Sequence, residues 1–234
     1  MTVNLKDLST ERLQKMLEAG AMVEECHRVL AKVGENIVSD ILKGTGTFYQ
    51  MNHYPEGDVY DHETHGQYYY HAHRDGEHGH FHLFLRPKGM PDGVNPVKVA
   101  DYEEPAAAND ALSHLIAISM DAYGIAQSLF TTNRWVTAEY WYDCEDVIKM
   151  LDSFEIDHAS PSWPANKWVG AMVQLFYPQI CTLLRQRDEV IKDWEKAHPD
   201  RNVYEDRDME IPSEMSCDYL KQIELITAEI ASRA

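Results

Sequence analysis

Positive charge is scarce in this chain. Its 234 residues contain 21 Lys and Arg against 39 Asp and Glu, so the formal net charge is −18. A protein that binds nucleic acid needs a basic surface for the phosphates, and anionic membrane surfaces attract basic segments. The composition therefore argues against nucleic acid and against membranes as partners.

Several familiar motifs are absent as well. The four cysteines, Cys26, Cys144, Cys181 and Cys217, lie far apart, so neither a zinc finger nor a covalent c-type haem is predicted. The sequence has no glycine-rich phosphate loop, no serine nucleophile elbow and no HExxH pattern. No apolar run approaches the length of a membrane span, and residues 1–7 lack the basic and apolar parts of a signal peptide. We expect a cytoplasmic protein.

Histidine, in contrast, is concentrated in one region. Eight of the twelve histidines lie between His53 and His82, and five of them alternate with other residues in the run 71–82. Successive side chains of a β-strand point to opposite faces, and Asp75-Gly76 is a favoured two-residue hairpin turn. A hairpin folded about this turn would place every imidazole of the run on one face. The expected opposed pairs are Arg74 with Glu77, His73 with His78, His71 with His80, and Tyr69 with His82.

The spacing on that face suits a metal ion. Directly opposed Cβ atoms lie about 5 Å apart and i, i+2 neighbours roughly 7 Å apart. His71, His73, His78 and His80 therefore bound a rectangle whose centre is about 4 Å from each corner, so their nitrogens can converge on an ion bound at about 2.0–2.1 Å. The alternative is a solvated face without a ligand, in which protonation below a pH of about 6.5 would set like charges against each other.

We therefore predict a transition-metal site. The predicted metal ligands are His71, His73, His78 and His80, with His82 and His53 close to them. Imidazole ligands suit iron, zinc, copper and nickel, and ligand type alone does not select among these metals. The site is either that of a metal-dependent oxidoreductase or hydrolase acting on a small molecule, or a closed site of a storage or sensor protein. Non-covalent haem between histidines is a third possibility.

In the enzymatic alternative the metal would activate water or dioxygen. Tyr69 or Glu77 would then transfer protons, and Arg134 would orient an anionic substrate. Arg134 precedes a run of aromatic and polar residues, 135–142, which we expect to line a pocket. The alternative for Arg134 is an ion pair with a surface carboxylate.

The pattern of elements predicts one α+β domain over residues 1–234, with an antiparallel sheet that contains the histidine-rich hairpin and is covered by long helices. Helices are expected within residues 1–44, the sheet within 48–142, and a helical part over 143–234. Ser9 is a good helix N-cap, residues 53–65 read as an ordered loop, and residues 114–120 and 125–131 form a second hairpin. A long helix up to residue 197 should be kinked or divided at Pro178. A short strand over 209–211 and a C-terminal helix from Ser213 or Ser216 complete the expectation.

Two resemblances bear on function. His71-x-His73 followed by Glu77 is similar to the first metal motif of the cupins, which implies a metal held by histidine and carboxylate with open positions. The second cupin motif is absent and the long helices differ from a jelly roll, so a cupin fold is not expected. The chain also resembles a bacterial family of unknown function, and that resemblance implies no reaction. It rests on the segments 53–58, 67–73, 77–82 and 129–135.

Overall fold

The computed structural model describes residues 3–233, which form an α+β structure around a six-stranded antiparallel sheet. The strands follow the order of the chain: β1 (Tyr54–Tyr60), β2 (Gly66–His71), β3 (Gly79–Leu85), β4 (Ser113–Met120), β5 (Ala126–Thr131) and β6 (Ser213–Ser216). The helices are α1 (Thr10–Ala31), α2 (Ile37–Ile41), α3 (Arg134–Thr137), α4 (Cys144–Met150), α5 (Trp163–Leu175), α6 (Tyr177–Ala197) and α7 (Tyr219–Ala231). Short 3-10 turns lie at Leu5–Asp7, Pro87–Gly89 and Val203–Glu205.

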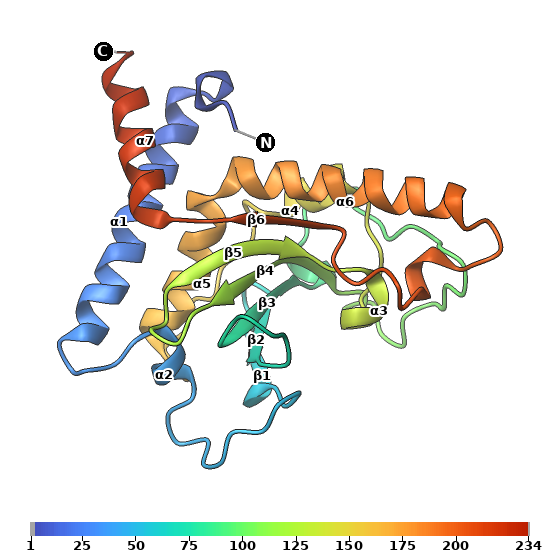
Figure 1. Cartoon of the computed structure of the whole chain (residues 1–234), viewed down its shortest axis with the longest axis horizontal. Coiled ribbons are helices and arrows are strands. Elements are labelled where there is room, and N and C mark those ends of the chain that lie inside the picture. The colour runs from blue at the N-terminus through green and yellow to red at the C-terminus, as the bar shows by residue number, and fades with distance from the viewer. Residues whose placement is uncertain (1–2, 234) are drawn as a thin grey trace.

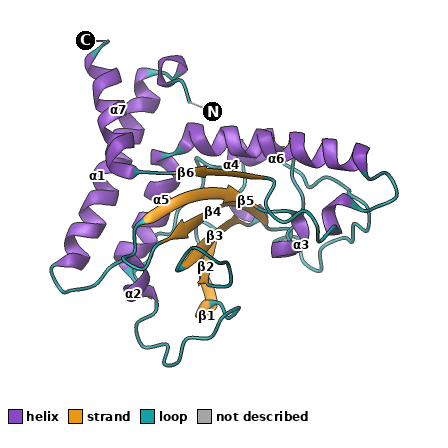
Figure 2. Cartoon of the chain, viewed as in Figure 1, coloured by secondary structure: helices purple, strands orange, loops and turns teal. Residues whose placement is uncertain are grey.

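One face of the sheet packs on α5, and α1 and α7 lie beyond that helix (Figure 1). Phe81 contacts the Trp168 ring at 5.6 Å between centroids, and the Tyr68 hydroxyl donates to Asn166 Oδ1 at 2.6 Å. Figure 2 shows the twisted sheet with α6 running along its β6 edge. Because neighbouring residues of a strand face opposite sides, this packing leaves the other face of β2 and β3 to the histidines.

The helical predictions are largely confirmed. The Ser9 side chain accepts a hydrogen bond from the Arg12 backbone N–H at 3.1 Å and caps α1. The long C-terminal helix is divided as expected, with α5 ending before Phe176 and α6 carrying Pro178 in its first turn. No helix within residues 3–233 is long and apolar enough to cross a membrane.

Three local predictions are wrong. The segment expected as a loop at residues 53–65 contains β1, whose turn-forming Gly57 and Asp58 adopt positive φ and make an irregularity inside the strand. Residues 213–216 do not start the last helix but form the edge strand β6, and Asp218 caps α7 instead. Residues 209–211 are not a strand. The sheet therefore takes its last strand from outside the expected range, because tertiary pairing with β5 outweighs the local helix-capping signal.

Candidate metal centre

Three buried histidines meet on the face of the sheet opposite α5. His71 lies at the end of β2 and is paired with His80 on β3, and His82 is the i+2 neighbour of His80 on the same strand. One nitrogen from each ring lies within 4.8 Å of the other two. The exposed fractions are 6% for His71, 1% for His80 and 0% for His82. These three residues are called the histidine triad below.

The two closest nitrogens of the triad are those of His71 and His80, whose Nε2 atoms are 2.7 Å apart. Two nitrogens bound to one ion at about 2.0–2.1 Å and at right angles would be about 2.9 Å apart, and on opposite sides about 4.2 Å apart. The separation of His71 from His80 is therefore close to that of a shared ion. The widest separation within the triad, up to 4.8 Å, would need to close by about 1.5 Å to reach the roughly 3.3 Å between neighbouring ligands of a tetrahedral ion.

His80 is oriented by a carboxylate. Its Nδ1 is hydrogen-bonded to Glu77 Oε1, which fixes the tautomer and leaves Nε2 free to face His71. The Glu77 side chain is only 5% exposed, and its other oxygen lies 3.6 Å from Arg74 Nη1, so these two residues form an ion pair across the turn although the strand pairing ends at His71 and His80. Burial opposes ionisation of Glu77, but the hydrogen bonds from His80 and Ser119 outweigh it and lower the pKa of the carboxyl. A histidine backed by a carboxylate is the usual arrangement of a metal-binding imidazole.

His82 is oriented by another histidine. Its Nδ1 lies 3.0 Å from Nε2 of His114 on β4, and Nδ1 of His114 lies 3.3 Å from the Thr132 hydroxyl. Among the described residues, His82 Nε2 has no hydrogen-bond partner although it is fully buried. Buried polar atoms are normally satisfied. An unpartnered imidazole nitrogen beside two others is therefore an unexplained group that a metal ion would satisfy.

Burial disfavours the charged forms of His71, His82 and His114. Desolvation lowers the pKa of His71 to about 2 and that of His114 to about 3, and it holds the pKa of His82 well below its ordinary value. Metal binding requires neutral imidazole. Protons therefore compete weakly for these ligands near neutral pH.

The hairpin itself has the predicted register but not the predicted distribution of rings. The pairs of His71 with His80 and Tyr69 with His82 are confirmed. His73 and His78 lie in the connection between β2 and β3 and are not paired. His73 remains with the triad, its ring centroid lying 4.8 Å from that of His71 and 5.0 Å from that of His80.

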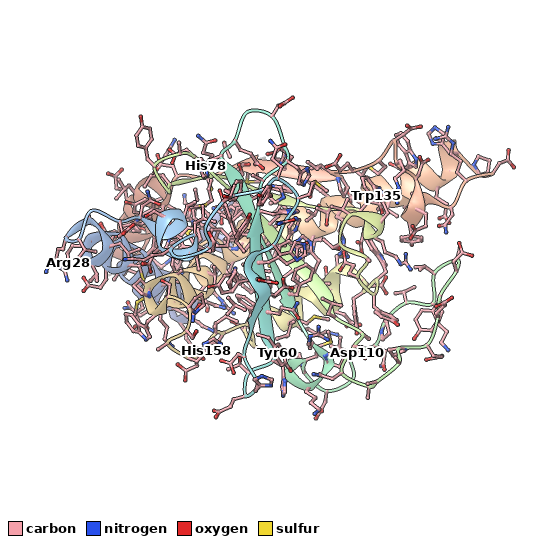
Figure 3. The ribbon with its side chains drawn as sticks, turned by 90° about the horizontal axis from the view of Figure 1, so that it is seen from below. Arg28, Tyr60, His78, Asp110, Trp135 and His158 are labelled. Atoms are coloured by element: carbon pink, nitrogen blue, oxygen red, sulfur yellow. The ribbon has the colours of Figure 1, made fainter. Side chains whose placement is uncertain are left out.

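His78 is the exception to the single histidine face, and for this residue the expectation is wrong. Its Nδ1 is hydrogen-bonded at 2.7 Å to the hydroxyl of Tyr70, a residue of the opposite, core-facing side of β2. Tyr70 reaches it because Gly79 has no side chain: a Cβ at Gly79 would lie 2.4 Å from the Tyr70 hydroxyl. The backbone N–H of His78 donates to Met120 on the neighbouring strand. Figure 3 shows His78 at the turn end of these strands and Tyr60 at the other end.

The remaining predicted site residues lie at different distances from the triad. The His53 ring stacks on Tyr69 at 3.6 Å between centroids and meets the edge of His71 at 5.6 Å, while its Nδ1 bonds to Asp58 at 2.9 Å. Tyr69 flanks both His71 and His82, with centroids 5.1 Å away in each case. Burial raises the pKa of the Tyr69 hydroxyl. His53 and Tyr69 therefore border the triad.

Arg134 is not brought to the triad. It forms an ion pair with Glu205, the arrangement considered above as the alternative for this residue. Arg134, Glu139, Tyr140 and Trp141 line a separate cavity of about 410 Å³. Figure 3 shows the adjacent Trp135 apart from His78 and the hairpin turn.

Comparison with known proteins gives a family but no activity. Residues 17–217 match the family DUF6969, a domain of unknown function. The chain belongs to this family. No curated protein and no solved structure matches the chain.

His114 is the functional candidate that the sequence did not reveal. In a regular β4 it would share the face of Ile116 and Ile118, which are core residues. The pairing of β3 with β4 shifts register between Leu83 and Phe84, and this irregularity sets His114 opposite Phe84. A shift of one residue moves a side chain to the other face of the sheet. No local signal in the sequence marks this shift.

Proposed function

We propose that the protein binds one first-row transition-metal ion at His71, His80 and His82 and uses it to activate water or dioxygen for reaction with a small molecule. The observation that carries this proposal is the convergence of three buried imidazoles with an unpartnered nitrogen on His82. Three protein ligands leave a coordination position for water or substrate, which is the arrangement of catalytic zinc sites. A metal with only neutral ligands also keeps its full positive charge, which favours deprotonation of bound water.

A cavity beside the triad supports a small-molecule substrate. The cavity measures about 950 Å³ and is lined by residues between Lys43 and Asp58, with His53 and Asp58 among them. The His53 ring, which lines this cavity, meets the edge of the His71 ring at 5.6 Å between centroids, so the cavity adjoins one member of the triad. Cavities of this size suit small ligands.

Within this proposal Glu77 and Tyr69 have different roles. Glu77 orients His80 through Nδ1 and strengthens it as a ligand. Tyr69 borders the triad, and because its pKa is raised by burial it keeps its proton and can donate a hydrogen bond to a group bound at the open position. We assign no role at the metal to Arg134, which is paired with Glu205.

Metal content and coordination test the proposal together. The untagged protein should contain close to one equivalent of a transition metal. The cobalt-substituted protein should change its visible spectrum when azide is added, because azide occupies an open position. Failure of the wild-type protein to bind zinc, cobalt, iron, copper or nickel would remove the proposal.

A closed site is the second candidate function, and the position of His73 favours it. The ring of His73 lies within 5.0 Å of those of both His71 and His80, so its rotation would supply a fourth ligand and saturate a tetrahedral ion. In that case azide would leave the cobalt spectrum unchanged, and His73→Ala would create azide sensitivity. Haem between His71 and His80 is disfavoured, because nitrogens on opposite sides of an iron atom would be about 4 Å apart, whereas these are 2.7 Å apart.

A further inference from the structure

A chain of hydrogen bonds connects His82 to the neighbouring strand. It runs from His82 Nδ1 to His114 Nε2 at 3.0 Å and from His114 Nδ1 to Thr132 Oγ1 at 3.3 Å. All three side chains are at most 2% exposed. Water therefore does not supply alternative partners for these ring nitrogens, and the tautomer of one ring determines that of the next.

His114 is held firmly in this position. Its backbone N–H donates to Glu139 Oε2 at 2.5 Å, and the register shift of β3 against β4 turns its ring to the histidine face. Its ring also contacts those of Phe84 and His82, with centroids 5.2 and 5.0 Å away. Backbone and ring contacts together fix where the Nε2 atom points.

The chain admits two directions of donation. In the first, His82 Nδ1–H donates to His114 Nε2, His114 Nδ1–H donates to Thr132, and Nε2 of His82 carries a lone pair. In the second, Thr132 donates to His114, His114 Nε2–H donates to His82 Nδ1, and Nε2 of His82 carries a proton that no described residue accepts. Only the first direction allows His82 to bind a metal through Nε2, because the second places a proton on that nitrogen.

We propose that His114 is a positioning residue that selects Nε2 of His82 as a metal-binding nitrogen and orients its ring toward His71 and His80. This inference rests on the metal-binding function proposed above. His114 acts as the hydrogen-bond acceptor for His82 in place of the carboxylate that Glu77 provides for His80. Partners of this kind set the orientation and basicity of the ligand they contact.

A matched pair of variants tests this role. His114→Gln keeps an acceptor at about the distance of Nε2 along the side chain, whereas His114→Met has similar length and shape but no comparable acceptor. The dissociation constant for Co²⁺ is measured by competition with a chelator, and the visible spectrum of bound cobalt reports the ligand field. We expect His114→Met to bind cobalt about 10–100-fold more weakly than wild type with an altered spectrum, and His114→Gln to restore both to within about threefold.

Thr132→Val is a second variant, which removes the partner of His114 Nδ1 with little change in shape. Thr132→Val is expected to weaken cobalt binding severalfold and to shift the visible spectrum of bound cobalt. Circular dichroism of the metal-free proteins shows whether each variant folds. If His114→Met does not fold, Thr132→Val tests the inference in its place.

If His114→Met folds and keeps the cobalt affinity and spectrum of the wild type, the inference is overturned while the metal site remains. The same result in Thr132→Val overturns it if His114→Met does not fold. Equal losses in the Gln and Met variants would also overturn it, because they would indicate packing alone. If wild-type protein binds no metal, the proposed function fails and this inference with it.

Discussion

Two histidines of the hairpin, His71 and His78, offer a direct comparison. His71→Ala removes a member of the triad, while His78→Ala removes a ring from the same hairpin that faces the other side of the sheet. Among the described residues the His71 ring has no hydrogen-bonding contact apart from that with His80, and its Nδ1 is unpartnered. Truncation at His71 therefore removes the partner of one other polar atom, His80 Nε2, which is itself a proposed metal ligand.

The magnitude follows from the number of ligands. Structural zinc sites with four ligands bind with apparent free energies of about 10–16 kcal/mol near pH 7, or about 2.5–4 kcal/mol for each ligand. Loss of one of three ligands should therefore weaken metal binding by roughly 10²–10³-fold. His78→Ala should change the affinity by less than about twofold, and its loss of the bond to Tyr70 should lower the free energy of unfolding by about 1 kcal/mol.

The assay is a competition titration of zinc or cobalt against a chromophoric chelator, with metal content measured on the same samples. Urea unfolding of each metal-free variant provides the control for folding. Equal affinities in the two variants, or a larger loss in His78→Ala than in His71→Ala, would refute the assignment of the triad.

Four further predictions follow from the contacts described. Glu77→Gln should weaken metal binding by about 10–100-fold, because His80 loses the carboxylate that orients it. This loss is smaller than that expected from removing a ligand. Chelator competition measures the affinity, and an unchanged affinity would contradict the prediction. Removal of the metal with EDTA should lower the melting temperature by roughly 8–16 °C, because a ligand at a thousandfold excess over its dissociation constant adds about 4 kcal/mol to the free energy of unfolding. An unchanged melting temperature after verified metal loss would count against a metal site in the folded protein. Burial lowers the pKa of His27 in the folded protein, so the unfolded chain binds a proton more readily, and the free energy of unfolding should fall as the pH drops below the unfolded pKa of about 6.5. His27→Phe should therefore reduce the loss of unfolding free energy between pH 7.5 and 5.5. An identical loss in the variant and the wild type would contradict this. Tyr68→Phe should lower the free energy of unfolding by about 1–3 kcal/mol, because Asn166 Oδ1 loses its buried donor; urea unfolding measures this, and a neutral effect would show that the hydroxyl is dispensable.

Much of the hairpin was predictable because its determinants are local. The alternation of histidines sets which residues share a face, and Asp75-Gly76 places the reversal, so the pairing of His71 with His80 follows from the sequence. The ion pair of Arg74 with Glu77 spans the same turn. Ser9 and Pro178 likewise act on the backbone within one turn of where they stand.

Other residues took positions that depend on distant partners. β1 was unpredicted because Gly57 and Asp58 are turn residues by local preference, yet pairing with β2 keeps them within a strand as an irregularity. β6 depends on the open edge of β5, which is more than eighty residues away along the chain. Such contacts leave no periodic signal in the segment itself.

The sequence by itself determined a strand-turn-strand unit with a row of imidazoles, because β-periodicity and turn preference act over a few residues. The tertiary structure decided which imidazoles meet. Packing of Tyr70 into the space at Gly79 draws His78 to the other face. A register shift between β3 and β4 brings in His114, which was expected only as part of a buried strand. The membership of the site is thus set by side-chain packing and strand register between elements distant in the chain, and neither is encoded in local spacing.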